Sequence, residues 1–187
     1  GGMGYFMFGG NIIDIGDLNS RLKRKGYSEL SDRFYSLGGG GYGLINRIVI
    51  GGEGHGLIGD STTGGNHKIS LAAGYGFFNL GYLVYSTSHL NVYPILGLGG
   101  GGLGLNISQR EALSFDEILD KPNRSANLST GGFLLNFALG TDYLLKRGGD
   151  GAGKEGLVIG VRIGYTFDPT PGDWSLSGTD LSDGPDI

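Results

Sequence analysis

The chain has 187 residues, and 39% of them are hydrophobic, which suits one domain with a real core. Its net charge of -4 provides no basic surface for a nucleic acid, so we exclude that class of partner. Cysteine is absent, which removes disulfides, thiolate metal sites and cysteine nucleophiles. Glycine accounts for 41 residues but proline for only 5, and the glycines follow neither a collagen nor a linker pattern, so we expect them to serve a folded structure.

The first part of the chain predicts three strands and a helix. Residues 1–13, 37–44 and 47–58 are the predicted strands. Residues 17–25 predict a short surface helix, because Leu18 and Leu22 lie four residues apart, basic residues follow them, and Gly26 ends the pattern.

A stretch without Asp, Glu, Lys or Arg follows, from residue 69 to residue 109. Its apolar residues alternate, which predicts strands rather than membrane-spanning helices, and glycine is too dense for such helices. The alternation changes phase at residues 77–79 and again across residues 99–102, and we interpret the first change as a β-bulge or bend. Residues 87–91 predict a turn between the two strand regions.

The clearest strands form a predicted hairpin around the turn 146–155. One face of this hairpin is apolar, whereas the other consists mostly of small or polar residues. Such a pattern suits a narrow barrel with little interior room, whose outside meets lipid or protein, with aromatic residues at the strand end as an interfacial girdle. The predicted lipid-facing or assembly face is Phe133, Leu135, Phe137, Leu139, Leu157, Ile159, Val161, Ile163, Tyr165 and Phe167.

These elements predict an all-β fold, namely a Gly-rich antiparallel β-barrel of about seven to eight strands. One or two short surface helices complete it, the second at residues 114–120. We place a single barrel domain at residues 1–167 and an extended acidic tail at residues 168–187, which Trp174 would anchor.

Motifs associated with enzymes lack their structural context. The pattern G-x-G-x-x-G occurs three times, at residues 38–43, 54–59 and 99–104, but no helical pattern follows it. A P-loop-like match at residues 148–154 has Glu155 where Ser or Thr must bind magnesium. The histidines show no metal-binding spacing, and no nucleophile elbow occurs. We predict no enzyme, no cofactor, no metal and no small-molecule substrate.

One set of polar residues predicts an internal cluster. Glu53 and His55 lie two apart on one strand face and would meet Arg162 or Asp142 inside the barrel. The cluster is either a gate or proton-linked group, or a satisfied internal polar network, and we favour the network.

The segments 78–85, 93–102, 131–135 and 160–167 carry a resemblance. They resemble small, Gly-rich envelope proteins of outer-membrane-barrel type from bacteria and archaea. The resemblance implies a secreted, non-enzymatic β-barrel and transfers no catalytic residue. It also implies a further closing strand after a Gly-Pro-Asp element such as residues 184–186, so over residues 1–187 we expect an open sheet edge.

Two functions follow as hypotheses. The first is a structural envelope protein of outer-membrane type, with its apolar face in membrane lipid. The second is an extracellular fibre subunit, in which residues 1–13 or 168–187 of one copy complete the sheet of the next. Both predict a secreted protein at the outer membrane or the extracellular surface. A soluble ligand-binding barrel is a weaker alternative, because no pocket lining is identifiable.

Overall fold

A computed structural model describes residues 1–109, 116, 125–148, 155–176, 178–182 and 184–185. The fold is all-β with one short helix in this part of the chain. The helix is α1 (Gly16–Arg24). The long strands are β1 (Gly2–Ile12), β2 (Arg33–Ile45), β3 (Ile48–Gly64), β4 (His67–Tyr82), β6 (Leu90–Gln109), β7 (Ser125–Gly148) and β8 (Glu155–Thr170), and the short ones are β5 (Tyr85–Ser86), β9 (Ser175–Leu176) and β10 (Thr179–Asp180).

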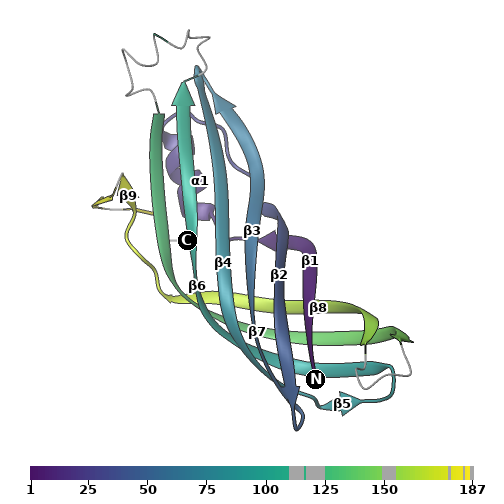
Figure 1. Ribbon diagram of the computed structural model, residues 1–187. Coiled ribbons are helices and arrows are strands. Elements are labelled where there is room, and N and C mark those ends of the chain that lie inside the picture. Colours follow the sequence, from purple (N-terminus) through teal and green to yellow (C-terminus); the bar gives the residue numbers. More distant parts are fainter. Residues whose placement is uncertain (110–115, 117–124, 149–154, 177, 183, 186–187) are drawn as a thin grey trace.

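The long strands form one antiparallel sheet in the order β1-β2-β3-β4-β6-β7-β8. All seven were predicted from the sequence, although the structure extends most of them. The sheet twists and curls strongly, so that β7 and β8 run across the direction of β2, β3 and β4 (Figure 1). The predicted turn at residues 87–91 is confirmed, because the Thr87 amide donates to the Leu90 carbonyl and β5 pairs with β6.

The sheet is not closed into a barrel, so the predicted β-barrel is wrong, whereas the expected open sheet edge is present in the described residues. Among the described residues, β1 pairs only with β2, and β8 pairs only with β7 and leaves its other edge open. The physical reason lies in the strand directions. Each neighbour along the sheet is antiparallel, so seven strands leave the two edge strands, β1 and β8, running the same way. Direct closure would need a parallel ladder in an otherwise antiparallel sheet.

Helix α1 forms where the sequence predicts it. Leu18 and Leu22 are buried, and the basic residues in the last turn favour the negative end of the helix dipole. Gly26 has a φ of +81°, which is the left-handed conformation that ends helices. The predicted second helix at residues 114–120 lies outside the described residues, except for Asp116, as does most of the hairpin turn 146–155.

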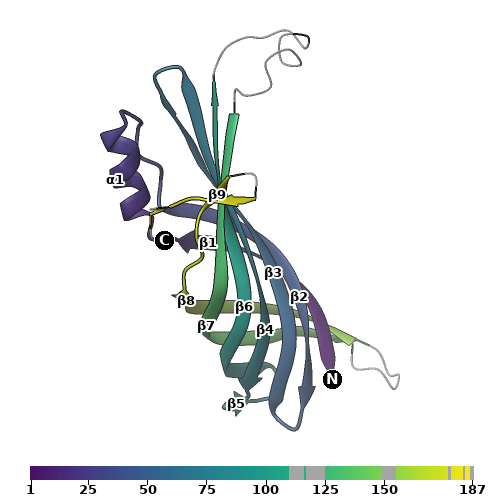
Figure 2. The same ribbon diagram turned by 90° about the vertical axis from the view of Figure 1, so that its left-hand side faces the viewer.

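An apolar core lies beneath α1 at one end of the sheet, which we call the capped end (Figure 2). Here Leu57, Leu71 and Leu105 from the sheet pack with α1 and with Trp174 of the tail. The Trp174 indole is 4% exposed and donates to the Pro185 carbonyl at 2.8 Å, while β9 pairs with β7 at Leu128 and Ser129. The tail therefore covers the inner face of the sheet at this end.

The predicted bulge near residues 77–79 is wrong, because β4 stays in register with both neighbours there. The inner face of β4 is apolar near the capped end, at Ile69 and Leu71, whereas its outer face is apolar at the opposite end, at Phe78 and Leu80. Strand β6 changes in the same way across Gly99, which pairs with Phe77. The apolar side thus switches faces along continuous strands, at one level of the sheet.

Inward-facing glycines at this level make room for large neighbouring side chains. An added Cβ at Gly99 would collide with the Gly76 carbonyl and approach the Phe77 ring to 2.8 Å. An added Cβ at the outward-facing Gly54 would meet only the Tyr75 carbonyl, at 3.9 Å. The inward-facing position 99 therefore requires glycine, whereas the outward-facing position 54 tolerates a larger residue.

Gly99→Ala and Gly54→Ala test this difference. The Gly99 variant should lose about 1–3 kcal/mol of unfolding free energy through overpacking. The Gly54 variant should change by less than about 0.5 kcal/mol. Denaturant midpoints of both variants measure the two effects, and equal losses would contradict the assignment.

Candidate functional site

Among the described side chains of the long strands, three charged residues away from the capped end point to the inner face. They are Glu53, Asp142 and Arg162, and each is at least half-buried. The other charges on these strands lie at the strand ends, such as Arg33 and Lys68, or near the capped end, as Asp60 does on the outer face of β3. A charge-bearing inner face is the reverse of an ordinary soluble sheet, whose inner face is apolar.

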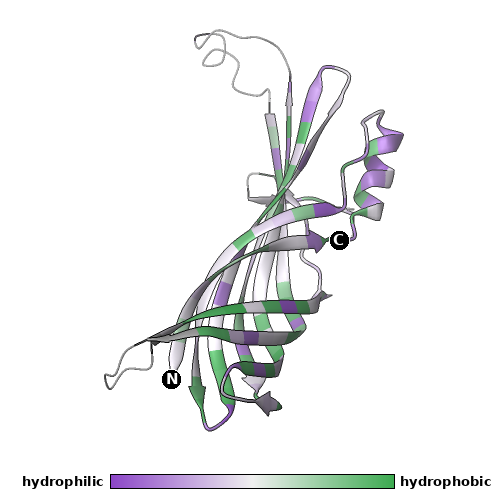
Figure 3. Cartoon of the chain, turned by 90° about the vertical axis from the view of Figure 1, so that its right-hand side faces the viewer, coloured by the Kyte–Doolittle hydropathy of each residue, from purple (hydrophilic) through white to green (hydrophobic). Residues whose placement is uncertain are grey.

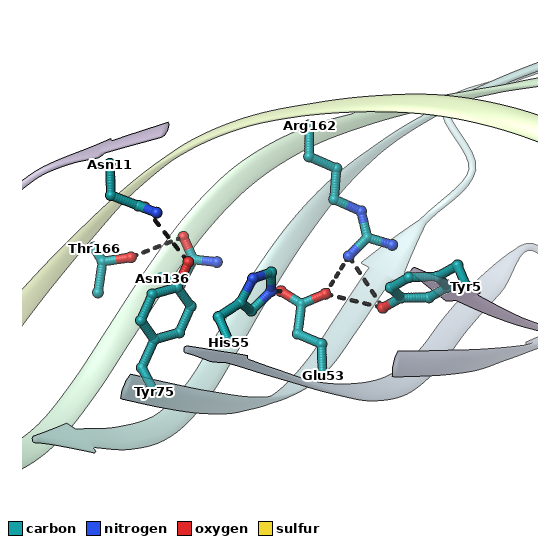
Figure 4. Close-up of polar contacts among 8 residues, drawn as sticks. All are labelled: Tyr5, Asn11, Glu53, His55, Tyr75, Asn136, Arg162 and Thr166. Carbon is teal, nitrogen blue, oxygen red and sulfur yellow. Dashed lines mark hydrogen bonds and ion pairs between the residues drawn. The ribbon is translucent and has the colours of Figure 1, made fainter. Parts of the chain in front are cut away.

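Glu53 and Arg162 form a buried ion pair across the interior (Figure 4). Their side chains are 6% and 16% exposed. The Tyr5 hydroxyl donates to Glu53 Oε2 at 2.9 Å and accepts from Arg162 Nη1 at 3.2 Å, and the guanidinium lies 4.8 Å from the centre of the Tyr5 ring. Since Tyr5 is on β1, Glu53 on β3 and Arg162 on β8, the group connects the two ends of the curled sheet.

His55 lies beside this pair and stacks on Tyr75, with ring centres 4.8 Å apart. Its Nε2 is 3.8 Å from Glu53 Oε1, which is too long for a hydrogen bond. Neither ring nitrogen has a hydrogen-bond partner in the described structure, although the residue is 8% exposed. His55 therefore contributes mainly stacking to the network.

Asp142 belongs to a neighbouring group. Its Oδ2 accepts hydrogen bonds from the hydroxyls of Tyr42 and Tyr93, the latter at 2.7 Å. The Tyr93 ring centre is 6.0 Å from the Arg162 guanidinium, so the two groups are adjacent. We call Tyr5, Tyr42, Glu53, His55, Tyr93, Asp142 and Arg162 together the interior polar network.

The structure brings Glu53, His55 and Arg162 together, and it places Asp142 one step away among tyrosines. The sequence reasoning missed Tyr5, Tyr42 and Tyr93. A usable signal was present for Tyr42, because it stands between two glycines on a strand, as Tyr75 also does. Such a tyrosine points to the face opposite its small neighbours.

The outer face carries a broad apolar surface. One registered row runs through Ile50, Leu80, Leu96, Phe137 and Tyr165, across five strands. We define the apolar belt as the exposed residues Phe6, Phe8, Leu37, Ile45, Ile48, Ile50, Phe78, Leu80, Tyr82, Leu96, Leu98, Phe133, Phe137, Leu139, Tyr143, Leu157, Ile159, Val161, Ile163 and Tyr165.

The belt lies at the end of the sheet away from α1, whereas α1 and the β3–β4 hairpin are more hydrophilic (Figure 3). Of the ten residues predicted for the apolar face on β7 and β8, eight are exposed on the outer face and belong to the belt. Leu135 and Phe167 are half-buried.

The charged groups of the interior polar network have partners within the chain. Its carboxylates are occupied by an arginine and by tyrosine hydroxyls, and an apolar cluster of Val49, Leu83, Tyr93 and Ile95 packs beside it. No group of three or more metal-ligating side chains is found among the described residues. Within the same residues, no helix is long and apolar enough to cross a membrane.

Comparisons with known proteins add no relative. No protein-family model matches the chain, and no curated protein or solved structure matches it.

Breaking the buried pair tests its structural role. Glu53→Gln leaves the Arg162 charge without its partner and should cost about 3–5 kcal/mol of unfolding free energy. The exposed pair Lys23–Glu29, with side chains 75% and 59% exposed, is the matched control. Lys23→Ala should cost at most about 1 kcal/mol in the same denaturant titration. A Glu53→Gln protein as stable as the wild type would contradict the role.

Proposed function

We propose that this chain is a non-enzymatic structural protein of the cell envelope, of outer-membrane type, embedded in lipid by its apolar belt. The observation that carries the proposal is the polarity of the strands. Away from the capped end, Glu53, Asp142 and Arg162 point inward, and the outer face of the strands there is apolar. A membrane β-sheet protein requires this arrangement, because a charge on the lipid face costs about 2–4 kcal/mol near the bilayer centre.

Exposure of the apolar belt to water is unfavourable. Phe6 and Phe8 are 96% and 92% exposed, and the belt continues over all seven long strands. Contiguous apolar patches larger than a few hundred Å² are rare on soluble monomers and mark contacts with a membrane or a protein. The belt therefore needs a non-aqueous partner, and lipid matches its breadth.

The switch of the apolar side along β4 supports a boundary between lipid and water. Toward the capped end, the outer face of β4 carries Lys68 and Ser70, and the apolar residues turn inward beneath α1. Toward the other end, the outer face carries Phe78, Leu80 and Tyr82. We infer that the capped end projects into water and that the belt lies in the membrane. The short turn Asn46–Arg47 and the start of β1 lie at the end of the sheet away from α1. Outer-membrane barrels likewise have short turns at one end, the periplasmic one.

The side chains that cross the middle of the interior favour an anchor over a channel. The interior polar network spans from β1 to β8, and apolar clusters lie on both sides of it along the strands. Its carboxylates already accept hydrogen bonds within the chain. We therefore propose a structural role at the outer membrane or cell surface, with neither catalysis nor conduction.

A fibre subunit is the second candidate, and the unpaired edges of β1 and β8 favour it. Strand exchange would use residues 1–13 or the tail as the donor. Both segments have contacts within their own chain, since β1 pairs with β2 and Trp174 is buried against the capped end. Exchange would have to break these contacts first, so we place this candidate second.

Single cysteines on one face of β4 test the membrane proposal, since the protein has no cysteine of its own. Leu80→Cys and Lys68→Cys both lie on the outer face, at opposite ends of the strand. A fluorophore at residue 80 should be quenched by spin-labelled lipids after reconstitution into vesicles, because that position contacts acyl chains. A fluorophore at residue 68 should stay unquenched. Equal quenching at both positions, or none at residue 80, would argue against insertion by the belt.

Electron microscopy separates the two candidates. The membrane proposal predicts that purified protein needs detergent to stay dispersed and forms no filaments. Long filaments that survive without detergent would instead establish the fibre subunit. Sedimentation with and without detergent gives the same distinction in solution.

A further inference from the structure

We propose that the open seam between β1 and β8 is a binding site for one added β-strand, which runs antiparallel to both edges. The seam is the gap between the unpaired edges of these two strands, which are 11 and 16 residues long. Unpaired backbone N–H and C=O groups on such edges are templates for strand addition. Within lipid each of them would cost several kcal/mol.

The directions of β1 and β8 specify which way the added strand must run. Six successive antiparallel pairings leave β1 and β8 pointing the same way. A single strand that runs the opposite way pairs antiparallel with both edges and raises the number of long strands from seven to the even number typical of closed barrels.

A second copy of the sheet fits this seam poorly. Two copies with the same orientation in a membrane present β1 and β8 edges that all run in one direction. Pairing between these edges would be parallel, whereas the long strands within the sheet pair antiparallel. The partner is therefore one extended segment rather than an edge of another copy.

The outer side chains of the partner should be apolar. Phe6 and Phe8 flank the seam on β1, and Ile163 and Tyr165 flank it on β8 with 77% and 71% exposure. Each of these side chains lacks a cross-strand neighbour on the seam side. Apolar residues at alternate positions of the added strand would pack between them, in line with the belt. This part of the proposal rests on the proposed membrane function, whereas the backbone pairing does not.

The inner side chains of the partner should be small at the middle of the seam. There the Arg162 guanidinium already reaches Tyr5 across the interior, so little room remains. At the capped end the seam meets a cavity of about 1180 Å³, which is lined by residues 10–12 of β1 and 164–168 of β8. Its described lining includes four aspartates, Asp14, Asp32, Asp168 and Asp173, and no lysine or arginine. The added strand should therefore carry a basic residue at its first end, which enters here.

A designed peptide and single cysteines test the proposal. The probe has 11 residues, matching β1, with an N-terminal lysine followed by alternating valine and serine, and one outward cysteine at its centre. It is added to detergent-solubilised Phe6→Cys and, separately, to Ile163→Cys. Leu98→Cys is the control, because it faces outward on β6, which is paired on both sides. A second control peptide has the same composition with its valines in one block.

The expected result is a disulfide to the alternating peptide at both Phe6→Cys and Ile163→Cys, and none above background at Leu98→Cys or with the block peptide. Directly opposed outward residues on antiparallel strands have the Cβ separation that a disulfide needs. Peptide capture at Leu98→Cys, or at neither edge, would overturn the proposal. Disulfides between Phe6→Cys and Ile163→Cys chains without peptide would assign the seam to a second copy instead.

This test stands apart from lipid quenching. Crosslinking in detergent reports the seam even if the belt does not insert into vesicles. Quenching at Leu80→Cys without crosslinking would retain the membrane proposal and remove the added strand.

Discussion

The buried ion pair between Glu53 and Arg162 is the interaction on which the curled shape depends. It joins β8 to β3, and Tyr5 extends the contact to β1, so side chains connect two sheet edges that no backbone ladder joins. Taking two charges out of water is costly unless they are paired and hydrogen-bonded, and here both conditions are met. The pair thus holds the inner face together across the open seam.

This polar inner face explains the outer face. Because the charges and tyrosine hydroxyls occupy the interior, the large aliphatic and aromatic residues of the same strands must point outward, where they form the apolar belt. Near α1 the relation reverses, since the helix and Trp174 cover the inner face there. One sheet therefore carries two environments along its length, and the proposed membrane boundary follows from where they meet.

Much of the candidate site could be predicted because it follows from strand periodicity. Glu53 and His55 lie two residues apart and so share a face, and Arg162 opposes the apolar face of its own strand. The pairing of Asp142 with Tyr42 and Tyr93 could not be predicted, because the two tyrosines come from strands far from Asp142 in the sequence. The predicted bulge failed for a related reason. A change of phase in a sequence does not distinguish a bend from a change of surroundings, and β4 has the latter.

The sequence by itself determined the strands, the helix and the apolar face of β7 and β8, because alternation and helix-ending signals are local properties of the chain. Only the tertiary structure decided that Arg162 rather than Asp142 reaches Glu53, that Tyr5 joins this pair, and that the strands do not close into a barrel. These features depend on the number and direction of strands that pair across long separations. An odd number of alternating long strands leaves two edge strands that run in the same direction, so these edges cannot pair with each other by an antiparallel ladder. No local pattern in the sequence encodes this relation between distant strands.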